Sequence, residues 1–329
     1  MKYSVLPNSG MEVSALSLGS YETYSRLEYR QIVDIVSRAL EAGITLFDVA
    51  HYTRAPHTEV ILSRALEDAG APDTTRIMTK VWKGSDPDAD VVSELKETLF
   101  RLKRDVVDIV LLYGPRWGVD DPVQHANDAR TLVDAGLSRS WGGINWSPEH
   151  FNTVLDSFEA DSAPLPVLMQ LKYNVARRSV GESDGYRRIF AERGVRMQAS
   201  DSLEGGVLAG KSTEGAGTTA RVLGRDPGRI REEIVAAMPE ITRIADGFGV
   251  STAELALAYA LAFEGTGTVL FGASSVTQLD TNLKSVALAD AHGAEIRELL
   301  DAAVQIDGHR LDVPPGSIVQ PDEDPYRER

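Results

Sequence analysis

The chain has 329 residues, of which 43% are hydrophobic and 25% are charged, a composition typical of a soluble globular protein. Its formal net charge of −15 argues against general nucleic-acid binding, which requires a basic face. The absence of cysteine excludes disulfides, thiolate catalysis and cysteine-ligated metals. No segment approaches the roughly 20 consecutive apolar residues of a membrane span or resembles the apolar core of a signal peptide. We therefore expect a soluble, cytoplasmic protein with no nucleic-acid or membrane partner.

Short β-rich runs alternate with longer amphipathic runs along the whole sequence. Residues 2–16 contain an Asn-Ser-Gly turn between two alternating runs, which predicts a hairpin. After the hairpin, strands are predicted at 15–20, 44–50, 76–81, 106–114, 138–145, 166–174, 195–200 and 268–274. The intervening apolar residues recur at helical spacing and predict helices at 27–43, 57–70, 88–103, 121–136, 147–160, 184–194, within 229–263 and at 275–288.

This order of elements amounts to a series of β/α units. Right-handed crossovers between parallel strands allow an open doubly wound sheet or a closed barrel, and regular repeats without a break favour a closed (β/α)8 TIM barrel. We expect the N-terminal hairpin to cover one end of this barrel. The glycine-rich segment 203–228 is longer than a usual connection and is predicted to be a functional loop after the seventh strand. No linker is evident, so we predict one domain over 1–329 with a flexible, Pro-rich tail from about residue 310.

The ends of two neighbouring strands supply an acid and an amine. In (β/α)8 barrels the active site lies at the C-terminal ends of the strands, where Asp48 and Lys80 are expected. A buried Asp–Lys pair keeps the ammonium charged, and that charge lowers the pKa of a nearby phenol so that it can release a proton near neutral pH. The alternative is a purely structural ion pair. The sequence alone allows both interpretations.

A series of motifs follows the order and spacing of one protein family. They are Gly19, FDVA with Asp48, TKV with Lys80, DIVLLYGP, GGINWSPEHF, MQLKYN, SLEGGVLAGK and GASSVTQLDTN. Together they resemble the aldo-keto reductases, most closely the potassium-channel β-subunit-like branch, over about residues 1–290. The resemblance implies a (β/α)8 barrel, an NADP(H) site and hydride transfer to a carbonyl, with a tyrosine as proton donor.

The resemblance also implies which residues hold the NADP(H) cofactor. Ser20 and Tyr21 match positions near the nicotinamide, and Asn145 and Gln170 match residues that hold its carboxamide. The matches around the pyrophosphate, ribose, 2′-phosphate and adenine are Leu203, Lys211, Arg221, Ser274, Gln278 and Asn282. A hydroxyl and amides at a helix N-terminus suit a phosphate. Without the resemblance, Ser274 would be an ordinary helix cap and Gln170 a satisfied core amide.

The position of the proton donor departs from the family pattern. Asp48 and Glu59 keep the family's spacing of eleven residues (59 − 48 = 11). This register places Thr53 where the tyrosine is expected, one position after Tyr52. Near a strand end one step reverses the direction of a side chain, so Tyr52 points away from the cofactor unless the local loop turns it inward. A threonine hydroxyl is too weak an acid to replace a phenol.

Other positions depart from the pattern as well. Tyr113 stands where most family members carry His, and it could donate the proton with Lys80 lowering its pKa, or simply line the pocket. His51 could orient or replace the acid, although a lone loop histidine is more often a bystander. Ile144 replaces a polar residue. An additional carboxylate at Asp201 would be unfavourable near phosphates unless it turns away or pairs with a cation.

We therefore predict an NADPH-dependent oxidoreductase that reduces a carbonyl, or a related C=C or C=N bond, of a small organic molecule. The predicted catalytic residues are Asp48, Tyr52, Lys80 and Tyr113, and no metal site is expected. The alternative is an NADP(H)-binding protein without reductase activity, such as a regulatory subunit, or a lyase or isomerase on the same barrel. Relatives in this branch assemble, so a homo-oligomer is compatible with either function.

Overall fold

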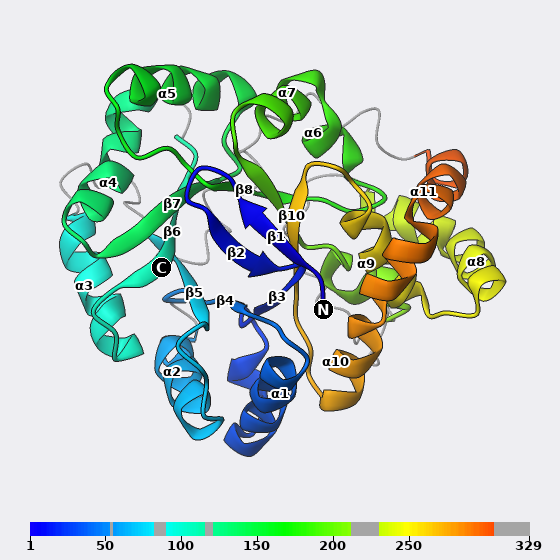
Figure 1. Cartoon of the computed structure of the whole chain (residues 1–329). Coiled ribbons are helices and arrows are strands. Elements are labelled where there is room, and N and C mark those ends of the chain that lie inside the picture. The colour runs from blue at the N-terminus through cyan, green and yellow to red at the C-terminus, as the bar shows by residue number, and fades with distance from the viewer. Residues whose placement is uncertain (53–54, 82–89, 116–120, 212–229, 306–329) are drawn as a thin grey trace.

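A closed parallel barrel forms the centre of the computed structural model, which describes residues 1–52, 55–81, 90–115, 121–211 and 230–305 (Figure 1). The barrel strands are β3 Leu16–Gly19, β4 Leu46–Asp48, β5 Arg76–Val81, β6 Val107–Tyr113, β7 Ser138–Ile144, β8 Leu168–Lys172, β9 Arg196–Ser200 and β10 Thr266–Phe271. They follow the ring order β10-β3-β4-β5-β6-β7-β8-β9, and β9 pairs with β10 to complete the ring. Within the described part of the chain, this ring confirms the predicted (β/α)8 TIM barrel.

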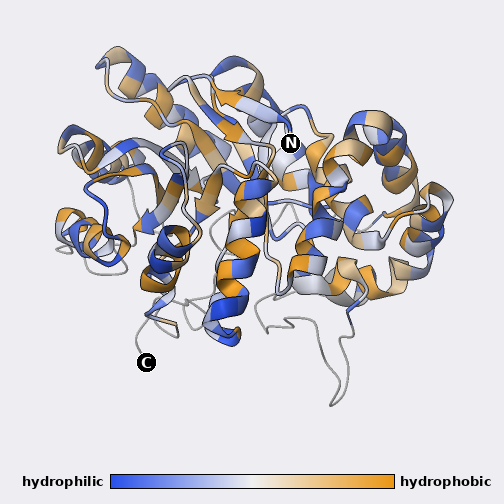
Figure 2. Ribbon diagram, turned by 60° about the horizontal axis from the view of Figure 1, so that its bottom comes forward, coloured by the Kyte–Doolittle hydropathy of each residue, from blue (hydrophilic) through white to orange (hydrophobic). Residues whose placement is uncertain are grey.

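Helices cover the outside of the barrel. They are α1 Tyr29–Glu41, α2 Thr58–Asp68, α3 Val91–Leu102, α4 Pro122–Asp134, α5 Pro148–Ala160, α6 Arg178–Glu182, α7 Asp184–Glu192, α8 Ile230–Phe248, α9 Thr252–Leu261, α10 Val276–Leu283 and α11 Ser285–Ala303. In α1 the buried residues Ile32, Ile35, Val36 and Ala39 follow helical spacing, which gives the helix one apolar face. Figure 2 shows the result, with largely hydrophobic strands inside a shell of helices that mix hydrophobic and hydrophilic residues. No helix in the described ranges is long and apolar enough to cross a membrane.

The N-terminal hairpin closes one end of the barrel, as predicted. Its strands β1 Tyr3–Leu6 and β2 Met11–Ser14 pair antiparallel. Leu6 and Val13 pack with the residues that fill the barrel interior, which are Leu46, Met78, Ile109, Leu111, Ile144, Val167 and Leu168. The Ser14 backbone N–H donates to the Thr45 hydroxyl at 2.9 Å, and Thr45 directly precedes β4. The hairpin therefore covers the N-terminal end of the strands, and the opposite end carries the candidate site.

The helices differ from the prediction in two places. The short helix α6 was not predicted, and the helix expected at 275–288 is divided at Lys284 into α10 and α11, with α11 continuing to Ala303. Gly293 lies within this continuation, and a Cβ at this position would lie 2.8 Å from the Ala262 Cβ. Its missing side chain lets α11 pack closely where Ile296 and Leu300 are buried. The predicted loop after β9 begins with a 3-10 helix, η2 Glu204–Ala209, whereas residues 212–229 and the predicted tail lie outside the described residues.

Replacing Gly142 of β7 by Ala should destabilise the barrel. The new Cβ would lie 2.6 Å from the Leu168 backbone oxygen and 2.9 Å from Leu111 Cδ2, so a strand must shift. We expect a loss of about 1–3 kcal/mol in the free energy of unfolding, measured by urea denaturation. Gly247 in α8 has open space around it, and Gly247→Ala should instead gain roughly 0.5–1 kcal/mol. Equal stability of the two variants would contradict this account of β7 packing.

Candidate active site

An acid and an amine meet at the C-terminal end of the barrel. Asp48 ends β4 and Lys80 lies near the end of β5, and Lys80 Nζ donates to Asp48 Oδ1 at 2.5 Å. Leu46 and Met78, two residues earlier on the same strands, pack in the barrel interior, so both charged side chains face inward. The side chains of Lys80 and Asp48 are only 7% and 2% exposed. The pair is therefore shielded from the solvent that weakens surface ion pairs.

A buried polar chain continues from this pair across the barrel. Gln170 Nε2 donates to Asp48 Oδ2 at 3.2 Å and to Gln198 Oε1 at 2.6 Å. Gln198 Nε2 in turn donates to Ser17 Oγ at 3.1 Å. The side-chain N–H groups of Gln170 thus donate within the protein, and its side-chain oxygen Oε1 can accept a hydrogen bond from a ligand. Sequence reasoning missed Gln198 and Ser17, although a polar residue at an inward position of a strand marks such a network.

Tyr52 is turned into the protein beside this pair. Its side chain is buried, and its ring lies edge-on against Tyr21 with centroids 4.9 Å apart. An isolated backbone bridge joins Tyr52 to Ala55, and β4 ends four residues earlier at Asp48, so strand alternation does not set the direction of Tyr52. Burial raises the pKa of the Tyr52 phenol well above its ordinary value, the Asp48 charge raises it further, and a hydrogen bond with the Ser20 side chain lowers it. Tyr52 is therefore a neutral phenol at neutral pH.

This pKa direction differs from the lowering that the Lys80 charge was expected to cause. Burial is the largest effect on Tyr52, and it favours the uncharged phenol. Ser20 is held in place because its backbone N–H and its Oγ both donate to the Asp48 carbonyl, at 3.1 and 3.0 Å. Thr53, the alternative donor position, lies outside the described residues.

Tyr113 lies at the end of β6 and completes a cluster of phenols. Ile109 and Leu111, earlier on the same strand, face the barrel interior, and Tyr113 packs against that interior while staying partly exposed. A negative charge on Tyr113 would raise the pKa of the Tyr52 phenol, so the two phenols lie close enough to interact electrostatically. His125 Nε2 donates to the Tyr113 carbonyl oxygen at 2.8 Å and thereby holds the strand end. The sequence analysis did not identify His125 as a supporting residue.

His51 does not enter this cluster. Its side chain is 46% exposed, and its Nδ1 lies 3.9 Å from Glu59 Oε2. Glu59 is buried and already binds the Thr98 hydroxyl at 2.9 Å and the Arg101 guanidinium. Asp48 and Glu59, eleven residues apart, therefore have different roles, because Glu59 joins α2 to α3 and Asp48 faces the barrel interior.

The residues expected to hold a dinucleotide lie at successive strand ends. Asn145 follows β7 in a left-handed conformation, with φ of 52°, and its backbone N–H donates to the Gln170 carbonyl at 3.1 Å. Leu203 precedes η2, and the aliphatic part of Lys211 lies over Gly206, where a Cβ would meet Lys211 Cδ at 2.7 Å. A non-glycine residue with positive φ is strained, and such strain is common where a loop is shaped for a ligand. Arg221 lies outside the described residues.

The N-terminus of α10 presents hydroxyl and amide groups to solvent. The backbone N–H and the Oγ of Ser274 donate to Gln278 Oε1 at 3.0 and 2.8 Å, and Ser275 caps the helix by accepting from the Gln278 N–H. Asn282, one turn later, is buried. Residues 274–282 contain no Lys or Arg, so neutral donors and the helix N-terminus would hold a phosphate here. This donor set fits a phosphorylated ribose.

The additional carboxylate at Asp201 is paired. Lys172 Nζ lies 3.8 Å from Asp201 Oδ2, and Asp201 Oδ1 accepts the Gly205 N–H at 3.1 Å. Asp201 is therefore paired as expected for an acid near phosphates, because Lys172 and a backbone N–H offset its negative charge. Ile144, the other departure, packs in the barrel interior.

Comparisons with known proteins agree with this architecture. The sequence model of the Aldo/keto reductase family matches residues 15–301. A probable voltage-gated potassium channel subunit beta from Arabidopsis thaliana is 26% identical over 302 residues, which cover 87% of this chain and 91% of that protein. Its counterpart from Oryza sativa subsp. japonica is 25% identical over 321 residues, covering 93% and 97%.

Solved structures show the same fold. A thermostable aldo-keto reductase in complex with the inhibitor epalrestat has a TM-score of 0.72 at 24% identity, covering 92% of this chain and all of that one (100%). An aldo-keto reductase from Bacillus halodurans in its holo form has a TM-score of 0.72 at 22% identity, covering 94% and 99%. The family model and the channel-subunit relatives confirm the resemblance inferred from the sequence motifs.

Proposed function

Because this chain belongs to the aldo/keto reductase family, an oxidoreductase family whose members generally bind NAD(P)H, we propose that it is an NADPH-dependent reductase of a small organic carbonyl or a related C=C or C=N bond. The observation that carries this proposal is the buried Asp48–Lys80 pair facing the barrel mouth beside Tyr52 and Tyr113. An ammonium that is held in place at the barrel mouth, in the same cluster as a neutral Tyr52 phenol, is an arrangement suited to proton donation.

Each residue of this cluster has a distinct part in the proposed chemistry. A bound nicotinamide would supply the hydride. Tyr52 would give its proton to the substrate atom that becomes negatively charged, with Tyr113 as the second candidate. Lys80 would stabilise the resulting phenolate, and the Asp48 carboxylate holds Lys80 in position. Because burial raises the pKa of Tyr52, the donor stays protonated across the neutral range.

The rim residues fit a nicotinamide dinucleotide. Gln170 on β8 and Asn145 directly after the neighbouring strand β7 carry side-chain amides. The Gln170 side-chain oxygen offers an acceptor for a carboxamide group, and the Asn145 side chain offers an amide. The glycine-rich segment from Leu203 to Lys211 and the N-terminus of α10 follow on the next two strands of the ring. We further propose that residues 1–329 act as one catalytic unit.

The preference for NADPH can be tested at the N-terminus of α10. We expect Ser274→Ala to weaken NADPH binding by about tenfold, because hydrogen bonds to charged groups contribute roughly 1.5–3 kcal/mol. NADH binding should change little, since NADH lacks the 2′-phosphate. Titration of tryptophan fluorescence with each dinucleotide measures both constants. Thr277→Ala, an exposed neighbour in the same helix, is the matched control. Equal losses of affinity for NADPH and NADH in Ser274→Ala would show that Ser274 does not bind the 2′-phosphate.

A second candidate function is supported by the channel-subunit relatives. On this alternative, the chain binds NADP(H) and regulates a partner without turning over a substrate. The two candidates differ in single-turnover experiments, in which enzyme-bound NADPH is mixed with a broad panel of aldehydes and ketones. Oxidation of bound NADPH by any of them, followed by its absorbance, supports the reductase. Tight binding with no oxidation across the panel supports the regulatory subunit.

A further inference from the structure

A buried ionic cluster lies where the glycine-rich segment leaves β9. Arg177 follows β8, and its Nε and Nη2 donate to Glu204 Oε2 and Oε1, both at 2.8 Å. The side chains of Arg177 and Glu204 are only 8% and 0% exposed. Two parallel hydrogen bonds between a guanidinium and a carboxylate fix the relative orientation of both groups, which a single contact would not. Neither residue was identified in the sequence analysis.

A third buried side chain ties the same two loops together. Asn174 Nδ2 donates to Glu204 Oε2 at 2.9 Å and to the Asp201 carbonyl at 3.0 Å. Its Oδ1 accepts the Ala176 N–H at 2.9 Å, so the loop after β8 is fixed as well. The loop after β8 and the segment after β9 thus meet through side chains rather than through strand pairing.

The backbone of the glycine-rich segment needs such an anchor. Asp201 and Glu204 both have left-handed conformations, with φ of 52° and 46°, and they are followed by Gly205 and Gly206 with φ of 63° and 104°. Glycine adopts these angles freely, so a run of them does not specify one loop shape. Strained non-glycine residues persist only where the surroundings over-determine them. The bonds from Arg177 and Asn174 to Glu204 provide that constraint.

Burial of charges makes a purely stabilising role a poor explanation. Removing two charges from water is unfavourable, and a buried ion pair contributes little net stability compared with apolar residues of similar size. Such a pair is better suited to selecting one conformation of the segment that it holds. That segment carries Leu203 and Lys211, which the proposed function assigns to the cofactor.

We propose that Arg177 and Glu204 are positioning residues that preset the Leu203–Lys211 segment for the phosphates of the dinucleotide. This inference rests on the proposed function. On this view the pair touches no substrate, and it acts by holding the segment in its binding shape before the ligand arrives. Its loss should therefore speed dissociation of the dinucleotide and leave the chemical step at saturation unchanged.

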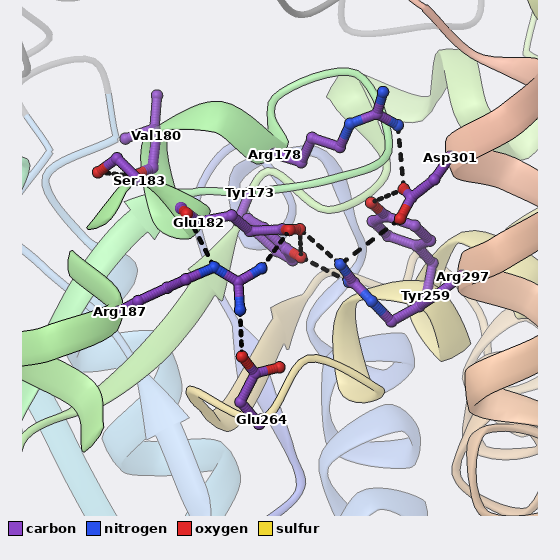
Figure 3. A network of polar contacts seen from close by, with 10 residues as sticks. All are labelled: Tyr173, Arg178, Val180, Glu182, Ser183, Arg187, Tyr259, Glu264, Arg297 and Asp301. Carbon is purple, nitrogen blue, oxygen red and sulfur yellow. Dashed lines mark hydrogen bonds and ion pairs between the residues drawn. The ribbon is translucent and has the colours of Figure 1, made fainter. Parts of the chain in front are cut away.

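A second ionic network in the same region provides a matched control (Figure 3). Arg297 of α11 lies over the Tyr259 ring of α9, and its guanidinium donates to Tyr173 and Glu182 at 2.8 and 2.7 Å. Asp301 joins the same network by accepting from Tyr259 at 2.6 Å. The side chains of Arg297 and Glu182 are 15% and 14% exposed. These bonds join α6, α9 and α11, and none of them involves a residue of the Leu203–Lys211 segment. Glu182→Gln therefore removes a largely buried carboxylate from its ion pairs with Arg297 and Arg187, at a position with no expected effect on the ligand.

The test compares Glu204→Gln, Arg177→Lys and the double variant Arg177→Met/Glu204→Gln with Glu182→Gln. NADP⁺ dissociation is measured by stopped-flow tryptophan fluorescence, kcat and KM are measured at saturating NADPH, and hydrogen exchange follows the amides of 203–211. The double variant removes both charges of the pair, so it should fold even if Glu204→Gln does not. We expect about tenfold faster NADP⁺ dissociation in the double variant, and a smaller increase in Arg177→Lys because the charge is retained. Exchange in 203–211 should accelerate, and kcat should remain unchanged.

Each outcome decides the inference. The double variant could show the same NADP⁺ dissociation rate, and the same hydrogen exchange in 203–211, as Glu182→Gln. That result would show that the Arg177–Glu204 pair is only structural. A fall in kcat with unchanged NADP⁺ dissociation would also overturn the positioning role. If the wild-type protein binds NADP⁺ but the Arg177 and Glu204 variants do not change NADP⁺ dissociation or exchange, the proposed function stands and this inference is wrong. If the wild-type protein binds no nicotinamide dinucleotide, the proposed function itself falls and the inference falls with it.

Discussion

Tyr52→Phe is expected to lower kcat by about 10²–10⁴-fold, the usual contribution of a positioned general acid. Tyr52 is buried against Tyr21, its phenol is within reach of Ser20, and it lies close enough to Asp48 for that carboxylate to raise its pKa. Phenylalanine keeps the ring and its packing and removes only the hydroxyl group, and with it the acidic proton. NADPH binding should therefore be retained, which fluorescence titration measures alongside turnover.

Tyr113→Phe is the matched control, because Tyr113 shares the cluster but is partly exposed. A loss of rate confined to Tyr113→Phe would move the role of donor to Tyr113. Unchanged rates in both variants would exclude both phenols and favour the regulatory-subunit alternative. The pH profile adds a further readout. Since burial favours the neutral phenol, deprotonation of Tyr52 should not reduce turnover as the pH rises through the neutral range.

Lys80→Met is expected to lower the free energy of unfolding by about 3–5 kcal/mol, because it leaves the buried Asp48 carboxylate without its ion-pair partner. Gln170 still donates one hydrogen bond to that carboxylate, but a neutral amide does not compensate for its charge. The same substitution removes the cation proposed to stabilise the phenolate, so turnover should fall as well. Urea denaturation and steady-state kinetics measure the two effects separately.

The double variant Lys80→Met/Asp48→Asn separates structure from catalysis. Removing both charges should restore most of the lost stability, since no uncompensated charge then remains in the barrel. Turnover should stay low, because the ammonium is still absent. Recovery of turnover together with stability would instead identify the pair as structural, the alternative that the sequence analysis left open.

The barrel was predictable because its strands carry strong local signals. The run RIMTKV was predicted as a strand at 76–81, and β5 has those bounds. Its alternation and its β-branched residues suit a strand between the barrel interior and the helix layer. The end of α11 was not predictable in the same way. Residues 289–303 include polar residues and Gly293, and this part of α11 packs against α9, with Gly293 next to Ala262 at the C-terminal end of α9.

The candidate site likewise contains residues that strand geometry predicts and residues that only the tertiary fold brings together. Asp48 and Lys80 could be predicted because they lie at or near the C-terminal ends of adjacent strands, whose geometry places them together without further information. The direction of Tyr52 could not be predicted, since Tyr52 lies beyond the end of β4, where strand alternation no longer applies. Arg177 and Glu204 lie on different loops, 27 residues apart in sequence (204 − 177 = 27), and only the fold brings them together.

The position of β10 beside β3 has a consequence for how the chain is made. Val269 pairs with Leu16 across 253 intervening steps of sequence (269 − 16 = 253), so the two ends of the ring are synthesised far apart in time. Until Thr266–Phe271 has left the ribosome, β3 and β9 each keep one open edge, and open edges invite pairing with other chains. We therefore expect ring closure to be a late, nonlocal step with a large entropic cost, during which the open edges of nascent copies are exposed to pairing with other chains.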